Sequence, residues 1–302
     1  WLPKLATGEL VGAIAMTEPG TGSDLQAIRT RAQATASGFV LRGAKTFISN
    51  GYLAGLVLVV CQSADTPGAR GMSIMLVDTQ HSPGYRVGRV LDKIGLKAQD
   101  TSELFFDDVA LGPDAVLGGP TGQGFYQLMS DLPYERLIIG VSAVAAMEGA
   151  YQATLEYTRE RRAFGQAIAD FQNTRFTLAD LKSRLQVGWA HLDWAIQRHV
   201  AGKLTPAEAS AAKLWHSEQQ FAICDAALQL HGGAGYMQEY AVSRQFRDAR
   251  LQRIGAGTDE VRAMAQDAAG QVYLVGSFSG LADFDPGPGT RNLGSNGGTD
   301  VY

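Results

Sequence analysis

Hydrophobic and polar positions follow two different periods along this chain, and the period changes near residue 118. Before that point, short β-type runs alternate with turns rich in Gly and Pro, which predicts strands rather than helices. The run 56–60 is apolar on both faces, so we expect a central strand there. The spacing favours a compact antiparallel barrel or sandwich. The predicted strands cover residues 12–16, 29–35, 39–41, 56–61, 72–77, 85–91 and 103–109.

After residue 118 the apolar positions recur with a helical period. Thr205 followed by Pro206 is a strong helix start, and Pro133 should bend the first helix. Long helices with short connections indicate a four-helix-type bundle, so the fold class is α+β. The predicted helices are 122–162, 171–202, 205–230 and 242–250. We expect the bundle core to contain Met147, Leu155, Phe176, Leu181, Trp189, Trp194, Trp215 and Phe221.

Composition narrows the class of protein. The 302 residues carry 45% hydrophobic side chains and a net charge of −4, which gives no reason to expect binding to nucleic acid or an anionic membrane. The longest apolar runs fall short of the roughly 20 residues that span a bilayer, and no signal peptide is expected. Cys61 and Cys224 lie in apolar stretches without metal-ligand spacing, which indicates reduced thiols in a cytoplasmic protein and no metal site.

Two stretches are candidates for chemistry. In the turn 16–24, Gly20 and Gly22 let the backbone approach a ligand, although an ordinary glycine-rich hairpin loop has the same composition. Glu135 directly precedes the apolar run 137–146, where loss of water raises the pKa of a carboxylate and makes it a better base. The alternative for Glu135 is a structural ion pair with an arginine.

The full turn Met16-Thr17-Glu18-Pro19-Gly20-Thr21-Gly22-Ser23-Asp24 resembles the flavin-binding signature of the acyl-CoA dehydrogenase family. The stretch 45–51 resembles the family's second flavin segment, in which an aromatic residue packs beside the isoalloxazine ring. By itself, Phe47 would more often be a core aromatic. The resemblance implies FAD contacts at Ala15, Met16, Thr17, Gly22, Ser23, Phe47, Ile48 and Ser49.

The resemblance extends into the helical part. The stretch 161–165 resembles the family's Arg-x-x-Phe-Gly element, and 229–236 is similar to its Gln-x-x-Gly-Gly-x-Gly-Tyr motif. In the family these elements reach the FAD of a neighbouring subunit, which implies a homo-oligomer, a tetramer built as a dimer of dimers. His231 is interpreted as a helix-end histidine. The implied FAD contacts are Arg161, Phe164, Gln172, Gln229, Gly232, Gly233, Thr258 and Glu260.

The position of the catalytic base separates branches of this family. Many members carry a glutamate in the last turn, where this chain has Gly255-Ala256-Gly257-Thr258. The isovaleryl and long-chain branches of the family instead carry the base on the long helix, and the stretch 132–136 closely resembles the long-chain branch. The resemblance therefore implies Glu135 as the base and the Ala256 N–H as a donor to the thioester oxygen. The implied acyl-CoA contacts are Ser23, Leu132, Tyr134, Arg136 and Gly257.

The implied reaction is FAD-dependent α,β-dehydrogenation of an acyl-CoA to the trans-2-enoyl-CoA, with an electron-transfer flavoprotein as acceptor. The alternatives are an acyl-CoA oxidase, which oxygen reactivity would separate, and a truncated flavin-binding remnant without turnover.

Two departures qualify the resemblance. Family members carry a helical domain ahead of the flavin turn that forms one wall of the acyl pocket, and substrate binding is expected to suffer without it. At the other end, residues 263–302 resemble one repeat of a secreted bacterial β-propeller, which should not be stable alone. The predicted organisation is therefore a flavin- and acyl-CoA-binding β domain (1–118), a helical bundle (119–262) and an unrelated tail in a truncated chimera.

Overall fold

The computed structural model describes residues 1–64, 66 and 68–257 in full. Beyond these it describes only the backbone of six short strands, which lie within residues 263–301. The chain forms two compact units, Trp1–Ser130 and Asp131–Tyr302.

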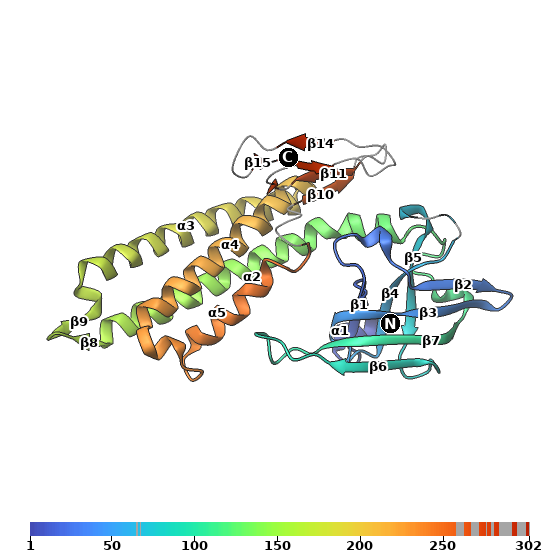
Figure 1. Cartoon of the computed structure of the whole chain (residues 1–302), viewed down its shortest axis with the longest axis horizontal. Helices are drawn as coiled ribbons and strands as arrows, with labels where there is room; N and C mark the ends of the chain where they lie inside the picture. Colours follow the sequence, from blue (N-terminus) through green and yellow to red (C-terminus); the bar gives the residue numbers. More distant parts are fainter. Residues whose placement is uncertain are drawn as a thin grey trace. The chain divides into compact units, whose positions relative to one another are not determined.

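A seven-stranded sheet organises the first unit (Figure 1). Its order is β1-β4-β2-β3-β7-β6, and β5 also pairs with β4. A short helix α1 (Leu2–Thr7) precedes the sheet. The strands are β1 (Gly12–Ala15), β2 (Arg31–Thr35), β3 (Gly38–Ser49), β4 (Leu56–Gln62), β5 (Met72–Asp78), β6 (Tyr85–Val90) and β7 (Thr101–Leu111).

The strand pairing is mixed rather than wholly antiparallel. β2–β3, β3–β7, β6–β7 and β4–β5 are antiparallel, as expected, but β1 runs parallel to β4 with Gly12 opposite Leu56. The chain passes through the β2–β3 hairpin between β1 and β4, and this connection is long enough for a parallel neighbour. β3 is also longer than predicted, and its pairing with β7 shifts register between Leu41 and Gly43 and again between Lys45 and Ile48.

The core of this unit lies on β4 and its neighbours. Val57, Val59, Val60 and Cys61 are all fully buried, which confirms the central strand predicted from the apolar run. Phe106 on β7 packs in the same core and contacts Tyr85 with ring centroids 5.6 Å apart. Burial on this scale supplies the main driving force for folding of the unit.

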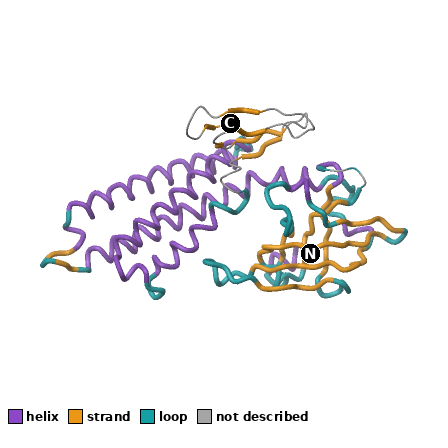
Figure 2. The backbone as a smooth tube through the Cα atoms, viewed as in Figure 1, coloured by secondary structure: helices purple, strands orange, loops and turns teal. Residues whose placement is uncertain are grey.

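The second unit contains long helices that run beside one another (Figures 1 and 2). A small hairpin of β8 (Arg162–Ala163) and β9 (Gln166–Ala167) joins the first two, which fits the predicted short connections. Thr205 and Glu208 form a capping box at the start of the third helix, confirming the predicted start. The helices are α2 (Gly124–Glu160), which begins in the first unit and contains Pro133, α3 (Gln172–Val200), α4 (Pro206–His231) and α5 (Ala241–Gln252).

The predicted bundle core is partly correct. Met147 and Leu181 are buried, and Leu155 and Phe221 pack against the core from partly buried positions. The prediction was wrong for Phe176, Trp189 and Trp194, which are all exposed. They fall off the inward stripe of α3, whose buried positions are Thr174, Leu178, Leu181, Leu185, Gly188, Leu192 and Ala195.

Among the fully described residues, no helix combines the length and apolar character needed to cross a bilayer. In the C-terminal stretch, short strands pair as β10 (Ala263–Gln266) with β11 (Val272–Val275), β12 (Ser277–Phe278) with β15 (Asp300–Val301), and β13 (Leu281–Asp283) with β14 (Asn292–Gly294). Apart from these segments, the predicted propeller-like tail lies outside the described residues.

Replacing Leu185 by Ala should lower the free energy of unfolding by about 2–5 kcal/mol, because its fully buried side chain leaves a cavity between helices. Val187→Ala on the same helix is the matched control, since Val187 is exposed and its truncation should change stability by less than ~0.5 kcal/mol. Urea unfolding followed by circular dichroism measures both. Equal effects would contradict the assignment of the inward face of α3.

Candidate active site

The glycine-rich turn of the first unit closes on itself and leaves space beside its backbone. The Glu18 N–H donates to the Thr21 carbonyl at 2.9 Å, and the Thr21 N–H returns a bond to the Glu18 carbonyl at 3.2 Å. A Cβ added at Gly20 would meet no atom within 4 Å, and neither Gly20 nor Gly22 has a left-handed backbone. The protein's own packing therefore does not require glycine there, which fits a turn whose backbone approaches a bound molecule.

A buried ion pair holds this turn against β3. The Lys45 Nζ donates to Glu18 Oε1 at 2.9 Å and to the Met16 carbonyl at 2.8 Å. The carboxylate also accepts the backbone N–H groups of Arg29 at 2.7 Å and Thr30 at 2.9 Å. Both side chains are buried, so each charge depends on these partners in place of water.

The pKa of Glu18 reflects this arrangement. Burial alone would raise the pKa of the Glu18 carboxyl, but the Lys45 ammonium and hydrogen bonds from Thr30 and Arg29 outweigh it and hold the pKa below its usual value. The carboxylate is therefore ionised, with Lys45 as its counter-charge.

The same anchor brings the two predicted flavin segments together. The Thr46 N–H donates to the Thr17 carbonyl at 2.9 Å, directly beside the ion pair. The next residue, Phe47, has a left-handed backbone with φ 58 and a side chain 67% exposed. Phe47 is thus not the core aromatic of the alternative interpretation. A left-handed non-glycine residue costs roughly 1–2 kcal/mol and persists only where its surroundings fix it.

The other predicted contacts of this unit differ in burial. Ala15 and Ile48 are buried. Gly22, Ser23 and Ser49 are exposed.

In the second unit, Glu135 lies partly buried on α2. Loss of water raises the pKa of its carboxyl above the usual value, the neighbouring charge of Asp131 raises it further, and Arg136 opposes both. A raised pKa is what a base for a weakly acidic carbon proton requires.

Arg136 points into the protein interior rather than toward solvent. Its Nη1 donates to Ser210 Oγ on α4 at 2.7 Å, and its Nε donates to the Ala256 carbonyl at 3.2 Å. This places the turn after α5 beside the helix that carries Glu135. Whether Arg136 also contacts acyl-CoA stays a prediction.

Ala256 occupies a constrained turn. Its φ is 51, a left-handed conformation in a residue with a Cβ, and Gly257 follows with φ 98. Among the fully described residues, the Ala256 N–H has no hydrogen-bond partner. Lys213 on α4 holds the turn from a second side, since its Nζ donates to the Gly257 carbonyl at 2.7 Å and the Arg253 carbonyl at 3.2 Å. The turn therefore offers a fixed and unused donor.

The remaining predicted residues of this unit lie at its helix ends. Phe164 is 96% exposed at the β8–β9 hairpin tip with φ 51, and Arg161 is also exposed. Gln172 begins α3. Gln229 accepts the Gly232 N–H at the end of α4.

Two further side chains, His231 and Tyr134, each stack on a neighbouring ring. His231 is buried, stacks on Tyr157 with ring centroids 4.1 Å apart, and has its Nδ1 2.8 Å from the Ala227 carbonyl, which supports its interpretation as a structural residue. Tyr134 stacks on His199 at 5.1 Å.

Some predictions have no structural outcome, and some contacts were missed. Thr258 and Glu260 lie outside the described residues. Sequence reasoning missed Lys213, whose partners are 40 and 44 residues away in the chain. It also missed the Glu18–Lys45 pair, although both residues fall inside the quoted motifs.

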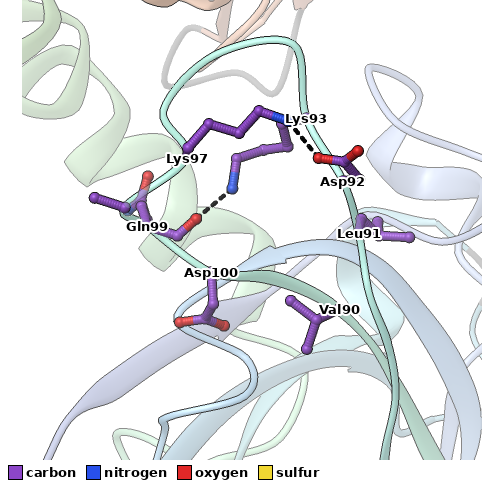
Figure 3. Close-up of a pocket in the computed structure, with 8 residues that line it drawn as sticks. Val90, Leu91, Asp92, Lys93, Lys97, Gln99 and Asp100 are labelled. Atoms are coloured by element: carbon purple, nitrogen blue, oxygen red, sulfur yellow. Dashed lines mark hydrogen bonds and ion pairs between the residues drawn. The ribbon is translucent and has the colours of Figure 1, made fainter.

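A separate hollow of about 350 Å³ lies in the loop between β6 and β7 (Figure 3). Lys93 Nζ donates there to the Gln99 carbonyl, and Lys97 pairs with Asp92. None of the predicted site residues lines this hollow, so it is not part of the candidate active site.

Lys45→Met should destabilise the protein by about 3–5 kcal/mol, because Glu18 would keep a buried charge without its partner. The double variant Glu18→Leu/Lys45→Met should be less destabilised than this single one, since it leaves no unpaired charge. Thermal unfolding measures both, with Lys4→Met at the exposed Lys4–Glu9 pair as control. Additive losses in the double variant would contradict a coupled pair.

The lowered pKa of Glu18 predicts that the folded protein loses stability in acid. Its pKa in the folded protein lies below its unfolded value, so its stabilisation is complete above about pH 4.5 and is lost as the pH falls through the folded pKa. Wild-type stability should drop across this range more steeply than that of the double variant. If stability falls with pH equally in the wild type and the double variant, the Glu18–Lys45 pair does not contribute to the acid sensitivity.

Comparison with known proteins agrees with this architecture. Residues 13–109 match the family model for the acyl-CoA dehydrogenase middle domain, and residues 122–269 match the acyl-CoA dehydrogenase C-terminal domain. The long-chain specific acyl-CoA dehydrogenase of Sus scrofa mitochondria is 46% identical over 264 residues, which are 86% of this chain and 61% of that protein. The chain thus spans about three fifths of the length of that curated relative.

Solved structures give the same result. The acyl-CoA dehydrogenase of Geobacillus kaustophilus superposes with a TM-score of 0.84 at 43% identity, over 87% of this chain and 69% of that one. A glutaryl-CoA dehydrogenase of Mycobacterium smegmatis, solved in complex with FADH2, superposes with a TM-score of 0.81 at 30% identity, over 87% of this chain and 66% of that one. The α+β fold expected from the sequence is confirmed, and the chain belongs to the acyl-CoA dehydrogenase family.

Proposed function

We propose that the protein is an FAD-dependent acyl-CoA dehydrogenase that converts an acyl-CoA thioester to the trans-2-enoyl-CoA. One observation carries this proposal. Glu135, a carboxylate with a raised pKa, lies on α2 next to Arg136, and Arg136 donates a hydrogen bond to the Ala256 carbonyl. Membership of the family and its long-chain relative support the reaction class.

The residues present fit FAD. Open space beside Gly20 would admit a flat polar ring, Thr17 and Ser23 offer hydroxyl groups, and the exposed Phe47 ring offers an apolar face. The exposed Arg161 suits a pyrophosphate, because its planar guanidinium matches phosphate oxygens. The related glutaryl-CoA dehydrogenase solved with FADH2 supports this assignment.

In the proposed reaction, the Glu135 carboxylate removes the α-proton of the thioester, and the electron pair of that C–H bond forms the new double bond. FAD, when bound, would supply the oxidising chemistry as the acceptor of the β-hydrogen as hydride. Glu135 keeps the proton until product leaves. Its raised pKa brings the carboxyl closer to the acidity of the carbon acid, which favours transfer.

The Ala256 N–H stabilises the charge that develops on the thioester oxygen. A donor aimed at such a charge contributes most when it is fixed beforehand and has no competing partner. Within the described chain both conditions hold for Ala256, whose carbonyl is held by Arg136 and whose N–H is unpaired. We assign acyl-CoA contacts to Ser23, Leu132, Tyr134 and Gly257 on the family pattern.

The proposal extends to partners and assembly. An electron-transfer flavoprotein would reoxidise the flavin, and the homo-oligomer would be a tetramer in which the exposed Phe164 hairpin reaches the flavin of another subunit. Free, buried Cys61 and Cys224 support a reducing, cytoplasmic setting.

Glu135→Gln should retain bound flavin while the anaerobic bleaching of its visible absorbance by acyl-CoA falls by at least about 10³-fold, because the amide cannot accept the α-proton. Glu156→Gln, an exposed carboxyl on the same helix, is the control and should bleach at the wild-type rate. Bleaching that survives in Glu135→Gln would assign the base elsewhere.

The pH dependence tests the environment of Glu135. Activity requires the ionised carboxylate, so kcat/KM should fall as the pH drops through a pKa above the ordinary 4.5 of a glutamate. Asp131→Asn should move this acidic limb to lower pH, because it removes a negative charge that raises the pKa of Glu135. If the acidic limb of kcat/KM does not move in Asp131→Asn, a group other than Glu135 controls the pH dependence.

A further inference from the structure

We propose that Lys213 is a positioning residue for the proposed dehydrogenation, and that it acts by holding the Ala256 turn. This inference rests on the proposed function, but its test separates the two. Nothing in the family pattern of the sequence singled out Lys213, which lies in the middle of α4 rather than in a motif.

The geometry of the contact is specific. The Lys213 side chain is only 3% exposed, and its ammonium donates to the carbonyls of Gly257 at 2.7 Å and Arg253 at 3.2 Å. These two carbonyls lie on either side of Ala256. The ammonium therefore links the two ends of the turn by binding a carbonyl oxygen on each side of Ala256.

A second buried cation acts on the same turn. Arg136 is 4% exposed and donates to the Ala256 carbonyl itself at 3.2 Å. Together, Lys213 from α4 and Arg136 from α2 contact the carbonyls of Arg253, Ala256 and Gly257. Two helices thus fix three carbonyl directions in a turn of five residues.

This clamp accounts for the conformation of Ala256. A residue with a Cβ does not stay in the left-handed region unless neighbouring contacts determine its backbone. Because the Arg253, Ala256 and Gly257 carbonyls all point toward the two cations, the backbone is fixed both before and after Ala256. The Ala256 N–H is left without a partner among the fully described residues, and so can serve as donor to the thioester oxygen.

A buried ammonium also destabilises the folded protein unless its N–H donors are hydrogen-bonded. A methionine of similar length would fill the same space without a charge. The use of a lysine at this position therefore indicates a requirement for its donors, and two of the atoms that receive them are carbonyl oxygens of the turn.

The test compares Lys213→Met with Lys203→Met, an exposed lysine of the same unit. In Lys213→Met, kcat and kcat/KM for acyl-CoA should fall together by about 10- to 100-fold, because the misplaced N–H is needed most in the transition state. Flavin content should stay at the wild-type level. Lys213→Arg, which keeps a cation with several donors, should recover part of the loss, and Lys203→Met should lose nothing.

Amide hydrogen exchange gives a readout that does not depend on turnover. Exchange at residues 255–257 should rise in Lys213→Met, while exchange in the middle of α2 and α3 stays unchanged. Unchanged exchange in the turn, or exchange that rises equally throughout the bundle, would overturn the proposal. If the wild-type protein binds flavin but its absorbance is not bleached by any acyl-CoA tested, the proposed function would be wrong. The exchange result would still decide the role of Lys213.

Discussion

The candidate flavin site depends first on the buried ion pair between Glu18 and Lys45. Both charges are buried, so each depends on the geometry that the other and nearby backbone groups provide. Because Lys45 lies on β3 and Glu18 in the glycine-rich turn, this requirement fixes the distance between two segments nearly thirty residues apart. The exposed Phe47 and the open backbone at Gly20 are both placed by this constraint.

The candidate acid–base site uses buried cations in a comparable way. Arg136 and Lys213 direct three carbonyl groups inward, and the Ala256 N–H is left without a partner in the part of the chain that the structure fully describes. Glu135 lies one residue before Arg136, so the contact that holds the turn also sets the position of the base along α2. In both units, a buried and hydrogen-bonded cation supports a group that we propose contacts a ligand.

The sequence predicted the secondary structure of both units well because their periodicity is strong. The apolar run of β4 and the start of α4 at Thr205 came directly from local patterns. Predictions failed where local pattern is ambiguous. Trp189 and Trp194 were assigned to the core from hydrophobicity alone, but the angular position of a residue on α3 decides its burial, and a shift of one or two residues moves a side chain from the buried face to solvent. The parallel pairing of β1 with β4 also has no local signature.

For the site, the sequence by itself determined the family motifs, the absence of a carboxylate at Ala256 and the presence of one at Glu135. These are properties of residue identity and order, so they are readable without coordinates. Only the tertiary structure decided that Phe47 is exposed, that Arg136 turns inward and that Lys213 binds the Ala256 turn. Such contacts join residues up to 120 positions apart, and they depend on the packing of whole helices. Burial and partner geometry, which set the charge state of Glu18 and the pKa of Glu135, exist only once the chain has folded.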